Sequence, residues 1–320
     1  MEIRCKICQG RASLFITKIF DDRYGYPKYF DLYRCENCKS FITWPQLDDS
    51  EISNLYTNYY PRRNINVEDI KKRANNFKVE SDLKQWLGGE HRIHRKLPRA
   101  QKIGIKVLDV GCGDGSSLFE LKTLGYDGYG IEADENLNKV KNELGLNIHI
   151  GMIEDCPYPK KSFDYIVANQ VIEHVVNLDS FIEKIKEFLK DDGVILMSTP
   201  NADSIFRKIY GKSWIHWHIP YHQQILSPSG VKKLFEEKGL IINNIHTVSP
   251  TSWTVHEINR LRYNPKIGEK SPFWNRGVSN TNTFIGRFLR KIFSIIMFIV
   301  GKIFDQFNQG NCLMIEVKTK

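Results

Sequence analysis

The sequence predicts an α/β protein with a mostly parallel, doubly wound sheet and a small N-terminal module built around cysteines. From Gly104 onward, apolar runs alternate with amphipathic stretches, as in repeated βα units. Before residue 45, two Cys-x-x-C pairs are separated by 26 residues, with β-like runs between them. We therefore expect four segments: a cysteine module (1–45), a basic helical bridge (46–103), an α/β core (104–250) and a C-terminal extension with an amphipathic helix and a final strand (251–320).

The expected elements follow from hydrophobic periodicity and from helix-ending residues. In the module, 12–20 and 29–33 are β-like, and in the bridge helix-compatible stretches lie around 68–87 and end at Gly88-Gly89. Ser227 can cap a helix that Gly239 ends. In the core we expect helices at 116–124, 135–144, 178–189 and 227–238, and strands at 106–110, 127–131, 146–150, 163–169, 194–198, 240–247 and 312–317, the last of them antiparallel.

The composition is that of a globular protein whose positive charge is concentrated in one region. Hydrophobic residues make up 41% of the 320 residues and charged residues 26%, and the formal charge is +9. Residues 61–106 hold 13 basic and 5 acidic side chains, so they supply +8 of it. Such a stretch forms either a solvated helix face or a surface for an anionic partner. No apolar run follows a charged start, so we expect a cytoplasmic protein without a secretory signal.

The two cysteine pairs predict a structural zinc site. Two thiolates three positions apart on a tight turn bind one tetrahedral ion, and Cys5, Cys8, Cys35 and Cys38 would complete a four-cysteine shell. A redox Cys-x-x-C is the competing interpretation, but it needs only one pair and a βαβ context. Four protein ligands leave no position for water, so the metal would be structural rather than catalytic. We expect the other three cysteines to be small buried hydrophobic residues.

A glycine-rich turn follows the first core strand in the run Asp109-Val110-Gly111-Cys112-Gly113-Asp114-Gly115. Glycines permit a ligand to lie against the turn at the start of the next helix. Dinucleotide enzymes use Gly-x-Gly-x-x-Gly instead. A carboxylate at Asp109 suits an ammonium group better than a pyrophosphate. The expected cofactor is therefore cationic and lacks phosphates.

The run 108–115 resembles the first motif of the class I S-adenosylmethionine (SAM) dependent methyltransferases, and the resemblance covers about 104–248. It implies a Rossmann-like core in which Glu132 accepts hydrogen bonds from the ribose hydroxyls. Met152 departs from the family's Gly-Asp pattern, so we expect apolar packing on the adenine there. The segment 163–175 resembles the part of the family that lies beside the sulfonium. The implied cofactor-binding residues are Asp109, Gly111, Cys112, Gly113, Glu132, Ala133, Met152, Ile153, Asn169 and Gln170.

Three residues are candidates for proton transfer. Glu173 and His174 follow the fourth core strand, at the sheet edge where open α/β sheets bind ligands. His222 lies in a histidine-rich loop, 214–227, between the fifth strand and the next helix. Each residue is either a catalytic base or a structural anchor of its loop. The three histidines of the loop lack an acidic neighbour in sequence, so we do not expect a metal there.

The C-terminal run 284–307 is apolar and flanked by basic residues. A spanning helix needs about 20 largely uncharged apolar residues, and the run is too short. It is compatible with a helix packed on the core, with a contact in a homodimer, and with peripheral contact at the inner face of the membrane.

The function expected from these features is methyl transfer to oxygen or carbon of a small-molecule or glycan-like acceptor, with lipid-linked acceptors included. Pro220-Tyr221-His222 followed by Leu226-Ser227 resembles methyltransferases of bacterial surface-polysaccharide and quinone biosynthesis. The alternatives are an RNA methyltransferase and a non-catalytic SAM-binding or zinc-mediated interaction protein. The chain lacks an Asn-Pro-Pro-Tyr-type motif for base methylation, so we do not expect a nucleic-acid substrate.

Overall fold

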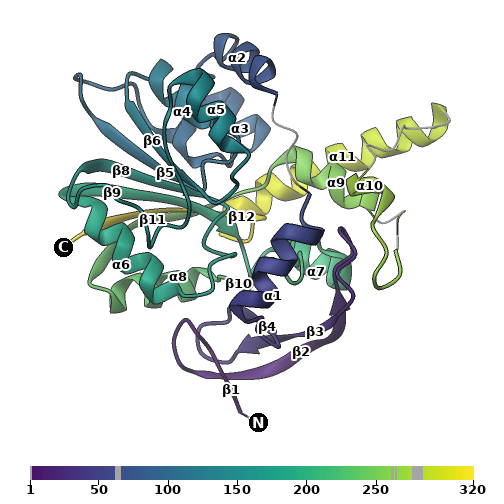
Figure 1. The fold of residues 1–320 in the computed structure, drawn as a ribbon. Coiled ribbons are helices and arrows are strands. Elements are labelled where there is room, and N and C mark those ends of the chain that lie inside the picture. The colour runs from purple at the N-terminus through teal and green to yellow at the C-terminus, as the bar shows by residue number, and fades with distance from the viewer. Residues whose placement is uncertain (1, 62–65, 261–262, 264, 276–283) are drawn as a thin grey trace. The chain divides into compact units, whose positions relative to one another are not determined.

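The computed structural model describes residues 2–61, 66–260, 263, 265–275 and 284–320, and its chain divides into two compact units (Figure 1). We call them unit 1 and unit 2. Unit 1 comprises 1–61, 200–233 and 246–313, whereas unit 2 comprises 62–199, 234–245 and 314–320. Each unit thus combines segments that are far apart in the sequence. The boundaries at 45, 103 and 250 stay predictions.

A seven-stranded sheet has the strand order β11-β12-β9-β8-β5-β6-β7. The pairs β5–β6, β5–β8, β6–β7 and β8–β9 are parallel, which confirms the mostly parallel sheet. Chain order reverses at β5, because β6 pairs with one of its sides and β8 with the other. Open α/β sheets bind ligands at the carboxyl ends of strands beside such a reversal. The strands are β5 (Lys106–Val110), β6 (Asp127–Glu132), β7 (Asn147–Ile150), β8 (Phe163–Asn169), β9 (Leu189–Pro200), β11 (Leu240–Val248) and β12 (Cys312–Thr319).

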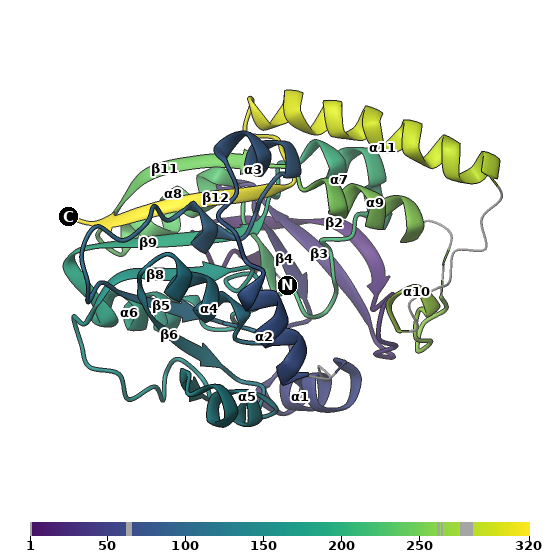
Figure 2. The ribbon, with the colours of Figure 1, turned by 90° about the horizontal axis from the view of Figure 1, so that it is seen from above.

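Burial on both faces explains the apolar runs of the central strands. Val107 and Leu108 of β5 and Ile166 and Val167 of β8 are fully buried, as expected for parallel strands covered by helices. Helices α4 (Ser116–Thr123) and α5 (Leu137–Leu144) cover one face of the sheet and α6 (Leu178–Phe188) covers the other (Figures 1 and 2). This arrangement confirms the doubly wound α/β fold.

The helix-compatible stretches expected around 68–87 of the bridge are two separate helices. These are α2 (Val67–Asn75) and α3 (Asp82–Gly88), followed by a short 3₁₀ helix, η2 (Ile93–Lys96). Ser81 starts α3, because its side chain accepts a hydrogen bond from the Lys84 amide (3.4 Å). Gly89 ends α3 with a φ of +61°, the left-handed conformation that glycine permits.

Unit 1 contains a five-stranded sheet with the order β1-β2-β3-β4-β10. The first four strands come from the cysteine module, whereas β10 pairs antiparallel with β4 through Gln224 and Ile42. The strands are β1 (Ile3–Arg4), β2 (Arg11–Phe20), β3 (Tyr29–Cys35), β4 (Phe41–Trp44) and β10 (Gln224–Ile225). Segments around them form α1 (Asp49–Asn54), the π-helix η1 (Leu55–Tyr59), α7 (Ile205–Tyr210), η3 (Gly211–Ser213), α9 (Thr251–Arg260), α10 (Pro272–Asn275) and α11 (Phe284–Asp305), with α8 (Pro228–Glu237) continuing into unit 2.

Aromatic side chains dominate the core of unit 1. Phe41 of β4 meets Trp217 edge to face, with ring centroids 5.1 Å apart and an angle of 84°. Trp214 and Tyr221 are fully buried in the same cluster, and Met297 of α11 joins it. The cysteine sheet, the histidine-rich loop and α11 therefore share one hydrophobic core.

Candidate functional site

The glycine turn lies between β5 and α4 and is held against the end of β6. The amides of Gly111 and Cys112 donate to the Ile131 carbonyl, at 2.8 and 3.1 Å. Gly111 and Gly113 have φ values of 72° and 63°, where side chains are strained. A Cβ on Gly111 would lie 2.7 Å from Cγ2 of Val171. Both the backbone conformation and the close approach therefore require glycine at position 111.

Glu132, the last residue of β6, faces this turn. Its Oε2 accepts a hydrogen bond from the Gly113 amide (2.8 Å), and its Oε1 accepts one from the Ala133 amide (3.0 Å). Oε1 also accepts a longer hydrogen bond from the Asp134 amide (3.3 Å). A carboxylate has about four acceptor sites, so these three amides still leave capacity for a ligand hydroxyl. The glycine turn and the acidic residue thus form one structure at the carboxyl edge of the sheet.

Asp109 lies inside β5 and is buried, with 3% of its surface exposed. Its carboxylate accepts a hydrogen bond from the Ser117 hydroxyl. Burial raises the pKa of Asp109 to about 6, because desolvation disfavours the charged form. The carboxylate is still mostly ionised at neutral pH, as a partner for a cationic ligand group must be.

Asn169 and Gln170 close the carboxyl end of β8. Asn169 Oδ1 accepts hydrogen bonds from the Ile93 amide (3.2 Å) and from the Ser198 hydroxyl (2.6 Å), so it links η2 to β8 and β9. Gln170 has a φ of +58°, a conformation that is uncommon outside glycine and typical of functional turns. Ser198 was not identified from the sequence, because its role depends on the pairing of β8 with β9.

The remaining expected cofactor residues differ in exposure. Met152 is 58% exposed after β7, whereas Ile153 and Cys112 are buried. A Cβ on Gly130 would lie 2.6 Å from Cys112 Sγ, so the Cys112 side chain packs directly on β6. Met152 thus presents the apolar surface at this position.

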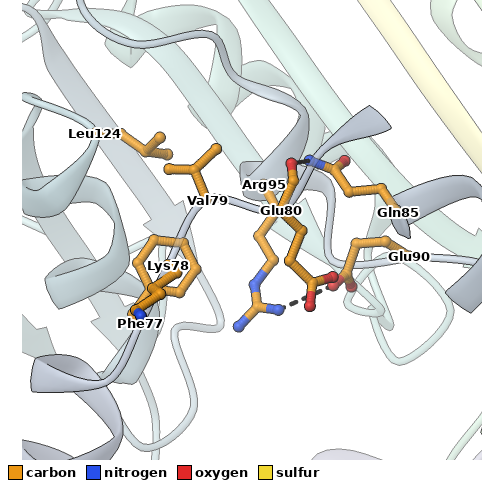
Figure 3. Close-up of a pocket in the computed structure, with 8 residues that line it drawn as sticks. All are labelled: Phe77, Lys78, Val79, Glu80, Gln85, Glu90, Arg95 and Leu124. Atoms are coloured by element: carbon orange, nitrogen blue, oxygen red, sulfur yellow. Dashed lines mark hydrogen bonds and ion pairs between the residues drawn. The ribbon is translucent and has the colours of Figure 1, made fainter. Parts of the chain in front are cut away.

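The bridge forms a charged network beside α4 (Figure 3). Arg95 pairs with Glu90 (3.0 Å) and Glu120, and its guanidinium lies over the Phe77 ring, 5.1 Å from the centroid. The hollow that Figure 3 shows has a volume of about 10 Å³, enough for one water molecule. A neighbouring hollow of about 290 Å³ is lined by the bridge and by Ser116 and Glu120 of α4. Arg95 of the bridge therefore has two acidic partners within unit 2.

Glu173 and His174 lie in the turn that follows β8. Glu173 is fully buried, and its Oε2 accepts a hydrogen bond from the Thr199 hydroxyl (2.9 Å). Its Oε1 has no hydrogen-bond partner in the part of the chain that the structure describes. Burial raises the pKa of Glu173 to about 8, so the carboxyl is mostly protonated at pH 7. The His174 amide donates to the Val171 carbonyl (2.9 Å), which makes the turn compact.

The four module cysteines lie together on two turns with the same hydrogen-bond pattern. In each turn the first cysteine's carbonyl accepts from the amide of the residue after the second cysteine, Gln9 or Lys39. Both of these residues have positive φ values, 54° and 64°. The sulfur atoms of Cys5 and Cys38 are 3.6 Å apart, those of Cys8 and Cys35 are 3.5 Å apart, and all four lie within 4.8 Å of one another.

The second cysteine turn is tied to the segment that follows the histidine-rich loop. The Cys38 carbonyl accepts hydrogen bonds from the hydroxyls of Ser227 and Ser229, the latter at 2.7 Å. The Ser227 amide donates to the Ser40 hydroxyl (3.1 Å). A Cβ on Gly230 would lie 2.2 Å from that hydroxyl oxygen, so the two segments are in direct contact.

His222 is buried and positioned from two sides within unit 1. Its Nδ1 lies 2.7 Å from the His216 carbonyl oxygen, so the hydrogen bond places the proton on Nδ1 and makes Nε2 the acceptor nitrogen. Its carbonyl accepts from the Thr43 hydroxyl (2.6 Å) of β4. His218 has a φ of +40°, so the loop contains a strained residue next to these contacts. Thr43 was not identified from the sequence, because it lies far from His222 along the chain.

Two more residues missed by sequence reasoning hold the start of the same loop. The buried Glu257 of α9 accepts hydrogen bonds from the Ile215 amide at 3.1 and 3.2 Å. Arg23 donates to the Ile215 carbonyl and stacks on Trp274, 4.3 Å from the ring centroid. Burial raises the pKa of Glu257 to about 8, and Arg23 partly offsets this effect. Neither residue could be identified from the sequence, because a single charged residue in a helix or a turn does not indicate which backbone group it contacts.

A sheet reversal beside β5, a Gly-x-Gly-x-Gly turn and an acidic residue at the end of the second strand define the class of SAM-dependent methyltransferases. The chain matches the family model described as a methyltransferase domain over residues 74–243. This match covers more than half of the chain, so the protein belongs to that family and is a SAM-dependent methyltransferase.

Two sequence relatives and one solved structure are also similar to this chain. The ubiquinone biosynthesis O-methyltransferase of Bradyrhizobium diazoefficiens is 26% identical over 176 residues, which are 50% of this chain and 69% of the relative. The mitochondrial enzyme of the same name from Bos taurus is 26% identical over 163 residues, 44% of this chain and 43% of the relative. More than half of the bovine protein therefore lies outside the alignment. A SAM-dependent methyltransferase from Archaeoglobus fulgidus aligns with a TM-score of 0.42 and 18% identity, over 85% of this chain and all of that one.

Proposed function

We propose that the protein transfers a methyl group to an oxygen or carbon atom of a small-molecule or glycan-like acceptor. The observation that carries the proposal is the joined glycine turn and Glu132 carboxylate at the carboxyl edge of the sheet. The histidine-rich loop of unit 1, with His222 held in one tautomer, supports proton removal from a hydroxyl. The two relatives named as O-methyltransferases of ubiquinone biosynthesis favour an oxygen atom on a small molecule.

In this proposal the cofactor edge holds SAM, which supplies an electrophilic methyl group when bound. The backbone at Gly111 and Gly113 lets the ligand lie against the turn, and Glu132 accepts from the ribose hydroxyls. Asp109 is ionised at neutral pH and balances the ammonium group. The exposed Met152 packs on the adenine. Gln170 presents its backbone beside the reacting centre through its unusual conformation.

Proton transfer has two candidate histidines. His222 has the tautomer of a general base, since Nδ1 is bonded to a carbonyl and Nε2 is the acceptor. His174 lies directly after β8, at the edge where the acceptor would meet the cofactor. Glu173 is mostly protonated at neutral pH, so it acts as a hydrogen-bond partner of Thr199 in β9 and as a base only at higher pH. We therefore favour His222 as the base.

We also propose that the four cysteines hold a structural zinc ion. A tetrahedron with Zn–S distances of about 2.3 Å requires sulfur atoms roughly 3.8 Å apart. The sulfur pairs at 3.5 and 3.6 Å, on two turns of the same type, fit this requirement. The cysteines would remain reduced in the cytoplasm, which is where we place the protein. Metal analysis of protein purified without chelator should give one zinc per chain, and protein without zinc would contradict the site.

The experiment that tests the activity is a screen for the methyl acceptor. The purified protein and methyl-labelled SAM are incubated with lipid, glycan, small-molecule and RNA fractions of a cell lysate. We expect label in the small-molecule, glycan or lipid fraction and none in RNA. The control is Gly111→Val, which introduces a β-branched side chain at a φ of 72° against Val171 and should transfer no label. Equal transfer by wild type and control, or transfer into RNA alone, would overturn the proposal.

A further inference from the structure

Helix α11 (Phe284–Asp305) presents an apolar face to solvent. Seven large hydrophobic side chains on this helix and the turn after it are between 39% and 68% exposed. Those inside the helix recur mostly at spacings of three and four residues, so they gather on one side of it. The residues are Ile292, Phe293, Ile295, Ile296, Ile299, Ile303 and Phe307. An apolar patch of this extent on a water-exposed helix marks an interaction surface.

The opposite side of α11 is fixed to unit 1. Met297 is buried in the aromatic core. A Cβ on Gly301 would lie 2.8 Å from Ser249 Cβ and 3.4 Å from the Phe206 ring, so the helix packs closely here. Asp305 accepts hydrogen bonds from the Ser249 amide (3.1 Å) and hydroxyl (2.8 Å). The helix lies beside α7 and α9 (Figure 2). The apolar face is therefore an exposed surface of a well-anchored helix.

The charge of α11 indicates what this face meets. The sequence from 284 to 304 has basic residues at 287, 290, 291 and 302 and no acidic residue. Lys291 is exposed, whereas Lys302 is buried, and the single acidic residue of the helix, Asp305, is bonded to Ser249. A helix that is apolar along one side, has an exposed lysine and has no exposed acidic residue is complementary to anionic lipid headgroups above acyl chains.

No helix in the described part of the chain is long and apolar enough to cross a bilayer. A helix that lies in the plane of the interface needs only one apolar face, and its basic residues remain among the headgroups. We propose that α11 is a membrane-interface helix that binds unit 1 to the surface of an anionic lipid bilayer. This inference is independent of the proposed acceptor.

A second copy of the chain is the competing occupant of the face. In an antiparallel pairing about a two-fold axis, the same flank of each helix lies on the same side of the contact. The exposed Lys291 side chains of both copies would then lie on the same side and repel one another. A bilayer with anionic headgroups meets the same charges favourably, and this difference decides between the two occupants.

The test measures co-sedimentation of the full chain with vesicles. We expect binding to vesicles of phosphatidylcholine mixed with phosphatidylglycerol, and at least roughly tenfold weaker binding to phosphatidylcholine alone or at high salt. The double variant Ile296→Glu/Ile299→Glu should bind the anionic vesicles at least roughly tenfold more weakly. The matched control is Ile209→Glu/Ile241→Glu, which introduces the same charges at isoleucines of similar exposure, 49% and 47%, outside α11.

Each outcome decides the matter. Loss of vesicle binding in the α11 variant, with binding retained in the control and SAM affinity unchanged in both, supports the proposal. Equal losses in both double variants would assign the effect to charge alone and overturn it. In the alternative outcome, the wild-type protein does not bind anionic vesicles and sediments as a dimer, whereas the Ile296→Glu/Ile299→Glu variant sediments as a monomer. This result would show that a second copy covers the face. Since none of these measurements involves methyl transfer, they are unaffected if the proposed acceptor is wrong.

Discussion

At the scale of single residues, Glu173 combines full burial with one hydroxyl donor and a pKa raised from 4.5 to about 8. The folded protein therefore binds a proton here that the unfolded chain has lost above pH 4.5. The resulting stability is complete below pH 4.5 and is lost as the pH rises through 8. Other buried carboxyls, such as Glu257, change the stability in the same direction, but they remain in a Glu173 variant and cancel in a comparison.

We predict that Glu173→Gln increases the free energy of unfolding relative to wild type at pH 9, by roughly 1 to 4 kcal/mol. Glutamine keeps the acceptor for the Thr199 hydroxyl and does not ionise. Urea unfolding at pH 5, 7 and 9 measures the difference, which should grow with pH. Glu154→Gln, at an exposed position, is the control and should show no such trend. A constant difference across the three pH values would refute the buried protonated carboxyl.

The histidines allow a second residue-scale prediction. If the acceptor is a hydroxyl, removing the true base should lower turnover by roughly 10²- to 10⁴-fold while SAM still binds. We predict this result for His222→Asn, together with loss of the acidic limb of the pH–rate profile. His174→Asn is the matched variant in the other unit and should change turnover only a few-fold.

Kinetics with the acceptor from the labelled-methyl screen, and calorimetry for SAM, measure both variants. The opposite pattern would make His174 the base. Turnover within a few-fold of wild type in both variants would leave positioning of the reactants, or Glu173, to carry the reaction.

At the scale of elements, β4 connects the cysteine turns with the histidine-rich loop. It begins three residues after Cys38, pairs with β10, and its Thr43 hydroxyl donates to the His222 carbonyl. Removing zinc should therefore disorder 1–45 and also shift the loop. We predict that chelation lowers turnover at least roughly tenfold and changes SAM affinity only a few-fold, because the cofactor residues belong to unit 2.

Turnover and SAM calorimetry before chelation, after it and after zinc is restored measure these effects. Cys35→Ser should reproduce the chelated state, whereas Cys156→Ser, also buried but outside the turns, should not. Parallel loss of SAM affinity and turnover would show that zinc supports the whole protein rather than the loop.

Elements also show what the sequence could predict. Strands β5 and β8 have the predicted bounds, because a continuous apolar run between polar breaks is a local signal. The two-residue strand β10 has no periodicity of its own, and only its pairing with β4 defines it. In the bridge, helix-compatible stretches were predicted around 68–87, but the boundary between them was not, because it depends on the hydrogen bond by which Ser81 caps α3. Gly111 and Glu132 could be identified from the sequence because each lies at the end of a predicted strand. Ser198 and Thr43 could not, because their contacts depend on strand pairings that sequence spacing does not encode.

At the scale of the whole molecule, the basic stretch 61–106 is the feature that would favour RNA binding. In the structure Arg92 and Arg95 both pair with Glu90, at 2.7 and 3.0 Å, and Arg95 also pairs with Glu120. Burial lowers the pKa of Lys96. Much of the local charge is thus already neutralised or desolvated, which reduces the counterion release that drives association with nucleic acid.

We predict that the protein does not bind RNA tightly near physiological salt. Fluorescence anisotropy with labelled RNA over a range of salt concentrations measures the affinity. The triple variant Arg92→Gln/Arg95→Gln/Lys96→Gln should behave like wild type. A tight, salt-dependent complex that this variant abolishes would instead indicate an RNA-binding surface.

The order of the strands in the seven-stranded sheet differs from the order in which they are synthesised, and this difference affects folding during translation. Strand β12 is the last described strand to emerge from a ribosome, yet in the sheet it lies between β9 and β11. While residues 249–311 are being translated, the edge of β9 that β12 will cover is open to pairing with another nascent chain. Slow translation over that interval should therefore increase aggregation, and a chaperone that shields β9 should rescue a slowly translated message more than a fast one.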